Sequence, residues 1–477
     1  MAGRPEPRRD KAYGLKGNRV RLVSRFALTT SLLAIAIVFG GGGSPAPIAE
    51  LVVQLAALLA LCAWPYLPRP DSDAPSLIDR LLWISAAIFV ATPLVQLVPL
   101  PPIIWHAFPG RETELAALNL VDAGNSWRPI SLAPYQTLAS ALSLIPPVTM
   151  LYFTSRLSAD ERTKLLAWVA GLALLSALVG VVQVASGDAN WPRFYRFPNV
   201  GMATGFQDNR NGTADIFLIG VLALCAFAAA RRDYMNSALG KLVLFALAML
   251  LILSVILTAS RAGTALLLIC PAFAFLIFRP RLRLNRHWIV ATAGGVAFLA
   301  VAGVSLRDNS ALNRTWARFA SVIDSRPRIW EDTQFAIGQY WPLGAGMGTF
   351  TTVFPAAERL EGVHATITNR AHQDYLEFVL ETGIAGIVLM IGALLALGYR
   401  VVTIIRRPHQ HLAVIHCLFG VGALTVLALH SLVDYPLRTM SLATVAALSL
   451  ALLSRSPREG DVRSGRVSTR RIREVTQ

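Results

Sequence analysis

The sequence predicts an all-α polytopic membrane protein of about 12 transmembrane helices, with one large, partly helical loop outside the membrane. Apolar runs of near twenty residues, the length that a helix needs to cross a bilayer, recur from end to end of the chain. Only 15% of the 477 residues are charged, whereas a soluble globular protein carries about a quarter. Both observations exclude an ordinary soluble domain.

The expected spans are short hydrophobic stretches separated by polar or basic segments. The first resembles a signal peptide because a basic leader precedes it, but the length of that leader favours an uncleaved anchor. The four cysteines each lie inside an apolar run, which predicts packing roles without disulfides or metal binding. In chain order the spans are 26–40, 47–67, 81–99, 134–154, 164–186, 212–230, 241–259, 262–279, 288–305, 379–399, 412–431 and 438–454.

The basic residues indicate the direction of the spans. The net charge of +16 could suggest nucleic acid, but most basic residues flank apolar spans and therefore act as topology determinants. With both termini in the cytoplasm, roughly two thirds of the lysines and arginines, and every lysine, lie on the cytoplasmic side. We therefore expect a multi-pass membrane protein that has both termini in the cytoplasm and binds no nucleic acid.

The long outer loops and the charged ends define the expected domain organisation. Outer loops cover about 100–133 and about 306–378, and the basic tail could touch anionic lipid. The expected parts are a leader (1–25), an N-terminal bundle (26–204), a central domain (205–400), two final spans (401–454) and the tail (455–477).

Arginines recur where the chain reaches the outer face, and lysine is absent there. A guanidinium is permanently charged and holds phosphate oxygens bidentately, which suits a lipid-linked diphosphate. The alternative is that such arginines extend to the interface and pair with carboxylates. Arg261 favours the first interpretation, because its hairpin between two spans is too short to swing freely. The outer arginines include Arg210, Arg261, Arg326, Arg328, Arg370 and Arg438, the last close to Asp434.

His372 lies in "RAHQDYLEFVLETGIAG", at the outer mouth of the tenth span. We expect it in the first turn of a helix that Gly383 interrupts, where the helix dipole and nearby arginines disfavour the imidazolium. A neutral imidazole beside an arginine-bound anion is a suitable general base. A histidine that merely forms a hydrogen bond at the interface is an equal alternative.

Three ordered segments make the chain resemble the O-antigen ligase family of bacterial membrane glycosyltransferases. They are "SRAG" at 260–263, "RPRIW…PLGAGMGTF" in the large outer loop, and "HQ" followed after nine residues by "GIAG". In this pattern His372, Gln373, Gly383 and Gly386 occupy the expected positions, and Gln373 stands where many relatives have Asn. The resemblance covers about residues 205–400.

This resemblance implies a specific chemistry. The donor would be a glycan on undecaprenyl diphosphate, and the acceptor a hydroxyl of a glycan or of the lipid A core; no cofactor or metal would be needed. Arg261 and Arg328 would hold the diphosphate, with Arg210 as a further candidate, and His372 would be the base. Gln373, Gly383, Gly386 and Asp434 would have supporting roles.

Other functions stay open from the sequence. The same domain occurs in polymerases that join lipid-linked repeat units, and a donor site would serve either enzyme. A transporter of a small anion or of a lipid-linked glycan is a different class, but transporters place ionisable residues near the midplane, and these predicted spans hold theirs at the ends. A structural subunit of an export complex would leave the arginine–histidine set unexplained.

Overall fold

The structure is a computed structural model, and every regular element in the part of the chain that it describes is a helix. An isolated antiparallel bridge joins Leu100 and Arg128. The described residues are 24–42, 47–67, 77–186, 192–195, 199, 201–231, 236–279, 326–363, 367–406 and 411–454.

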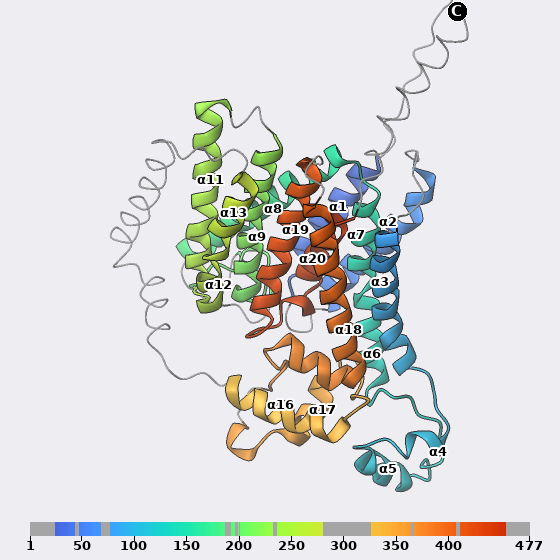
Figure 1. Cartoon of the computed structure of the whole chain (residues 1–477). Coiled ribbons are helices and arrows are strands. Elements are labelled where there is room, and N and C mark those ends of the chain that lie inside the picture. The colour runs from blue at the N-terminus through green and yellow to red at the C-terminus, as the bar shows by residue number, and fades with distance from the viewer. Residues whose placement is uncertain are drawn as a thin grey trace, which may run out of the picture.

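The helices follow the chain in the order of the predicted spans (Figure 1). Those of the first half are α1 (Arg25–Phe39), α2 (Pro47–Ala63), η1 (Trp64–Tyr66), α3 (Leu77–Gln96), α4 (Pro102–Trp105), α5 (Glu112–Asn119), α6 (Pro134–Ser143), α7 (Ile145–Ser155), α8 (Ala159–Ala185) and α9 (Arg210–Ala230). Those of the second half are α11 (Ala238–Leu257), α12 (Arg261–Leu266), α13 (Ile269–Phe278), α16 (Arg326–Tyr340), α17 (Phe350–Ala357), η3 (Leu360–Gly362), α18 (Asp374–Ile405), α19 (His411–His430), η4 (Pro436–Arg438) and α20 (Met440–Leu452).

The prediction of a helical polytopic membrane protein is confirmed. Within the described ranges, eight helical segments are long and apolar enough to cross a membrane, and three shorter apolar helices accompany them. These eleven correspond to eleven of the twelve predicted spans. The predicted ninth span, 288–305, lies outside the described residues, as do the start of the following loop (306–325) and the tail (455–477).

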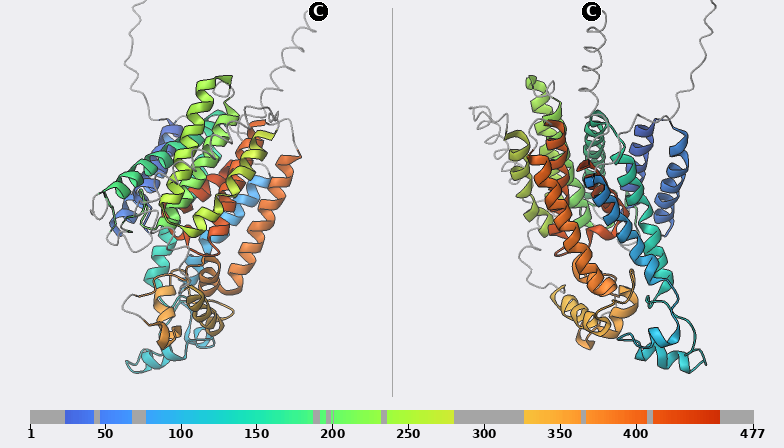
Figure 2. Two further views of the ribbon diagram at one scale, coloured as in Figure 1. Left: turned by 90° about the vertical axis from the view of Figure 1, so that its left-hand side faces the viewer. Right: turned by 45° about the vertical axis from the view of Figure 1, so that its right-hand side comes forward.

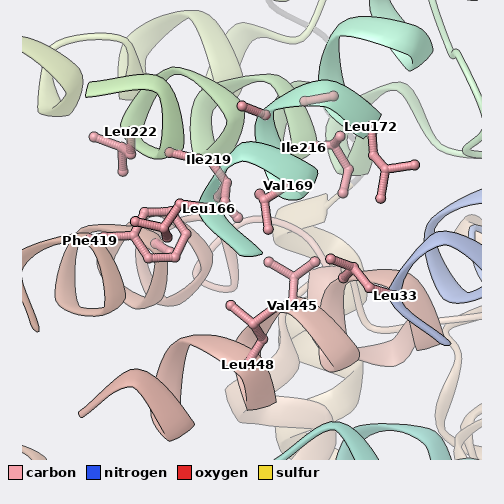
Figure 3. Close-up of a cluster of buried hydrophobic side chains, with 14 of the residues drawn as sticks. Leu33, Leu166, Val169, Leu172, Ile216, Ile219, Leu222, Phe419, Val445 and Leu448 are labelled. Atoms are coloured by element: carbon pink, nitrogen blue, oxygen red, sulfur yellow. The ribbon is translucent and has the colours of Figure 1, made fainter. Parts of the chain in front are cut away.

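The buried core lies where α8, α9, α19 and α20 pack together. Figure 3 shows Leu166 and Val169 of α8 facing Ile219 of α9, Phe419 of α19 and Val445 of α20. The central helix is α9, because 83% of its spanning segment is buried within the protein, against 17% for α11. The predicted 26–204 and 205–400 regions therefore contribute to one shared core.

A small helical unit, which we call the head, covers one end of the bundle (Figures 1 and 2). It consists of α4, α5, α16 and α17 with their connections. Phe350 and Phe354 of α17 stack with ring centroids 4.8 Å apart, and they belong to a second buried cluster with Ala336 of α16 and Leu380 of α18. This cluster fixes the head against the start of α18.

A break in α18 receives the glycine-rich loop that follows α16. Gly383 has φ of +59°, a conformation that favours glycine, and a Cβ there would lie 1.9 Å from the carbonyl oxygen of Pro342. The loop fills the break, since Ile384 N–H donates to Pro342 O and Gly346 N–H donates to Glu381 O, both at 2.9 Å. The predicted interruption at Gly383 is confirmed, and it positions the loop.

Candidate active site

His372 lies immediately before α18 and pairs with a carboxylate from the turn after α19. Its Nδ1 is 3.1 Å from Oδ1 of Asp434, and its ring packs edge-on against Tyr435, with centroids 5.0 Å apart. His372 has φ of +52°, Gln373 is the N-cap residue without a side-chain cap bond, and α18 begins at Asp374. The expectation that His372 forms part of the first helical turn was therefore wrong. The chain must leave the helical conformation to bring the ring to Asp434.

Asp434 is a buried carboxylate with every oxygen bonded. Its Oδ2 accepts from the amides of Asn209 at 3.0 Å and Asn211 at 2.6 Å, which flank the start of α9. Its side chain is 3% exposed, and its backbone N–H donates to the carbonyl of His430 at 2.9 Å. The two asparagines therefore hold the carboxylate in one orientation, with Oδ1 directed at His372.

The surroundings keep Asp434 ionised. Burial acts to raise the pKa of Asp434, but the hydrogen bond from His372 and the positive charges of His430 and Arg326 outweigh it and lower the pKa below its usual value. An ionised carboxylate only accepts hydrogen bonds, so Nδ1 of His372 is the donor. In the neutral imidazole Nε2 then carries the lone pair. This atom makes no hydrogen bond within the described residues, and the side chain is 29% exposed.

Arg261 begins α12 beside the first turns of α9. Ser260 caps the helix, its Oγ accepting from Gly263 N–H at 3.0 Å. A Cβ on Gly263 would lie 2.4 Å from Cβ of Ala214, so the glycine allows α12 to approach α9 closely. The "SRAG" segment thus brings a half-buried arginine to the end of the bundle that carries the dyad of His372 and Asp434.

Arg210, the first residue of α9, stands between the two asparagines that hold Asp434. Its guanidinium donates to Sδ of Met202 at 3.2 Å, and the side chain is half-buried. The position of Arg210 in the chain therefore places a second arginine next to the asparagines that bind Asp434.

The two arginines at the start of α16, Arg326 and Arg328, differ in burial. Arg326 is half-buried, and its charge acts on both Asp434 and His430. Arg328 is exposed, and no contact with the dyad is seen for it. Arg326 is consequently the better placed of the two, although the sequence pattern favoured Arg328. Other site residues that the sequence analysis did not assign are Asn209, Asn211 and Tyr435.

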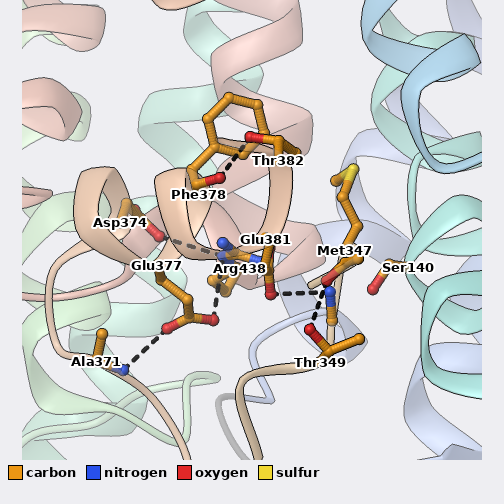
Figure 4. A network of polar contacts seen from close by, with 12 residues as sticks. Ser140, Met347, Thr349, Ala371, Asp374, Glu377, Phe378, Glu381, Thr382 and Arg438 are labelled. Atoms are coloured by element: carbon orange, nitrogen blue, oxygen red, sulfur yellow. Dashed lines mark hydrogen bonds and ion pairs between the residues drawn. The ribbon is translucent and has the colours of Figure 1, made fainter. Parts of the chain in front are cut away.

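A second polar group, which we call the carboxylate cluster, lies one turn further along α18 (Figure 4). Arg438 contacts three acids, with guanidinium nitrogens 2.8 Å from Glu381 and 3.5 Å from both Asp374 and Glu377. Arg370 also binds Glu377, at 2.8 Å. Burial opposes the charge of Arg438, but the three carboxylates raise its pKa further above the usual value. These two arginines neutralise acids of α18.

The fold and the site define a polytopic helical membrane protein with an aspartate–histidine dyad and several arginines at the head end of its bundle. No cluster of three or more metal-binding side chains occurs among the described residues. Residues 246–391 match the sequence model of the family described as O-antigen ligase, which comprises membrane glycosyltransferase-like ligases and polymerases. The match confirms the resemblance seen in the sequence. No curated protein matches the chain.

The matched segment contains only part of the site. It includes Arg261, Arg328 and His372, together with Gly383 and Gly386. Gly386 is buried, and a Cβ there would lie 2.0 Å from Oγ1 of Thr382, so its role is close packing. Arg210 and Asp434 lie outside the matched residues and join the site through the fold.

Proposed function

We propose that this protein transfers a glycan from undecaprenyl diphosphate to an acceptor hydroxyl, as an O-antigen ligase does. The observation that carries the proposal is the oriented dyad: an ionised Asp434 fixes Nδ1 of His372 as a donor and leaves Nε2 as an open base. The helices α9 and α12, which begin with Arg210 and Arg261, start at the same end of the bundle as the dyad, and His372 itself lies in the segment matched by the ligase family.

The proposed reaction uses His372 as the general base. Nε2 accepts the proton of the acceptor hydroxyl while that oxygen attacks the anomeric carbon of the donor sugar. The bond between the anomeric carbon and the diphosphate oxygen breaks, and the lipid diphosphate leaves with the electron pair. Asp434 stabilises the imidazolium that forms, since its Oδ1 lies 3.1 Å from Nδ1.

The diphosphate needs positive groups at the end of the bundle that carries the dyad. Three arginines remain candidates from the sequence: Arg261, Arg210 and Arg328. Arg326 is a stronger candidate than Arg328, because its charge helps to lower the pKa of Asp434. A guanidinium can bind two phosphate oxygens at once and offset the charge that develops as the bond breaks. Arg438 and Arg370 are poor candidates, because carboxylates already contact them.

The proposed setting is the bacterial inner membrane, with the head in the periplasm and both termini in the cytoplasm. The distribution of basic residues supports this orientation, because the segments that would lie inside carry most of them. The partners would be the lipid-linked donor, the glycan or lipid A-core acceptor, and the surrounding lipid.

A polymerase of the same family is the second candidate, because the family match covers both activities. A strain deleted for this gene separates them on a lipopolysaccharide gel. A ligase predicts loss of long lipopolysaccharide with accumulation of lipid-linked polymer, and a polymerase predicts accumulation of single repeat units. Complementation by the wild type should restore the profile, and complementation by His372→Gln should not. An unchanged profile in the deletion strain would contradict both candidates.

A further inference from the structure

A second histidine–carboxylate pair lies behind the dyad, wholly inside the protein. Nδ1 of His430 is 2.6 Å from Oδ1 of Asp215, and both side chains are 0% exposed. Asp215 comes from α9 and His430 is the last residue of α19, so the pair joins two helices of the core. Nε2 of His430 and Oδ2 of Asp215 have no hydrogen-bond partner within the described residues. Neither residue belongs to the motifs or to the proposed base and its carboxylate.

The geometry favours a charged pair. A contact of 2.6 Å is shorter than the usual range of N–H···O bonds, and bonds between charged partners are the shorter ones. His430 also occupies the C-terminal end of α19, where the helix dipole stabilises a cation. Asp215 supplies the counter-charge that a buried imidazolium requires.

The pair is directly connected to Asp434. The backbone N–H of Asp434 donates to the carbonyl of His430 at 2.9 Å, so the two residues are separated by one helical turn. The charged groups that face this region are Asp215 from α9, Arg326 from α16 and His372 from the segment before α18. Arg261 begins α12, which packs against both α9 and α19.

From this arrangement we infer that the His430–Asp215 pair positions the dyad: its buried imidazolium keeps Asp434 ionised, so that Asp434 can only accept from His372. His430 is thus a positioning residue that acts through Asp434. The expected effect of His430 on the pH profile of transfer rests on the proposed function. Its expected effect on the protonation of Asp434 does not. The alternative is a pair that only holds α9 and α19 together.

The sign of the pH effect follows from the low pKa of Asp434. In the wild type the carboxylate stays charged, and the stability that it contributes is lost only when the pH falls below its usual titration range. His430→Asn keeps a donor near Asp215 but cannot be charged. We expect the pKa of Asp434 to rise by roughly one unit or more, the size that a nearby opposite charge produces. A protonated Asp434 no longer holds the tautomer of His372, so activity should fall at a higher pH than in the wild type.

The experiment is infrared spectroscopy of the purified full-length protein in detergent, as a function of pH. The carboxylic acid band that Asp434→Asn removes reports the protonation of Asp434. In His430→Asn this band should appear at least about one pH unit higher than in the wild type. Asp215→Asn should act in the same direction, because a buried imidazolium without a counter-charge loses its proton, and the double variant should add little. Asp215→Glu should restore the wild-type band.

Two controls separate this role from a structural one. His416 is the other buried histidine of α19 and binds Thr163 at 3.0 Å, at the opposite end of the helix, so His416→Asn removes a comparable contact without changing the charge near Asp434. It should leave both the band and the pH profile of transfer unchanged. A band that does not move in His430→Asn, or that moves equally in His416→Asn, overturns the inference even if the wild type transfers glycan. A shifted band in a protein without transfer activity would instead contradict only the proposed function.

Discussion

The dyad and the carboxylate cluster lie at the same end of the bundle and share the start of α18, but their bonding differs. In the carboxylate cluster two arginines meet three acids, and the side chain of Arg438 is 14% exposed while Glu377 and Glu381 are fully buried. In the dyad, Asp434 is equally buried, but His372 is 29% exposed and its Nε2 makes no hydrogen bond within the described residues. Similar residue types thus form a closed group in one place and an open one in the other.

This difference provides a criterion for distinguishing a structural charge cluster from a catalytic site. Buried ion pairs satisfy each other, and breaking one is costly because it leaves an unpaired charge. A catalytic base instead keeps one atom unbonded for its substrate, while other groups fix its orientation. Of the two groups, only the dyad has such an atom on a partly exposed side chain, because Oδ1 of Asp374, which also lacks a hydrogen bond, is buried. The comparison can be tested by changing one member of each group.

The largest effect should follow from His372→Gln. The amide keeps much of the ring's size but cannot take up a proton, so transfer should fall by at least about 10²–10⁴-fold, the range that a general base contributes. Transfer of labelled donor to acceptor by the purified protein measures this loss. His106, whose Nε2 lies 2.9 Å from the carbonyl of Gly124 in the head, provides the control. Activity in His372→Gln equal to that of His106→Gln would remove the base assignment.

The carboxylate cluster should respond mainly in stability. Arg438→Gln leaves three buried acids without their shared partner, and breaking such a pair costs about 3–5 kcal/mol. Thermal unfolding in detergent measures the change. Arg359→Gln is the matched control, because that arginine pairs with Glu331 and Asp332 while 51% of its side chain is exposed, and such surface pairs contribute little. A stable Arg438→Gln protein that has lost only transfer would place Arg438 in the site instead.

Part of this arrangement could be predicted from the sequence, because the signals are local. Apolar length identified the spans, and glycine at position 383 marked the break in α18. The polar residues around His372 marked the site because they stand directly before an apolar helix. In contrast, the bond between His372 and Asp434 joins residues 62 positions apart, and it depends on how the turn after α19 packs against α18. No local pattern encodes that contact.

Helical periodicity could not separate the two arginines at the start of α16. The buried residues of this helix are Asp332, Thr333 and Ala336. Arg326 lies two turns before Thr333 on the same face, but Arg328 lies four residues before Asp332 and shares its face as well. The half-burial of Arg326 and the exposure of Arg328 therefore depend on how α16 packs, which no local pattern encodes.

The two arginines of α16 provide the finest test, because they differ by two positions on one helix. If Arg326 binds the diphosphate, Arg326→Ala should raise the barrier to transfer by about 2.7–4 kcal/mol, as loss of one preorganised electrostatic contact does. Arg326→Lys should remain impaired, since an ammonium lacks the bidentate fork. Arg328→Ala should change kcat/KM by less than about threefold, because surface substitutions have small effects. The reverse ranking, with Arg328→Ala the more damaging, would restore the motif-based assignment and show that α16 turns its other face toward the donor during the reaction.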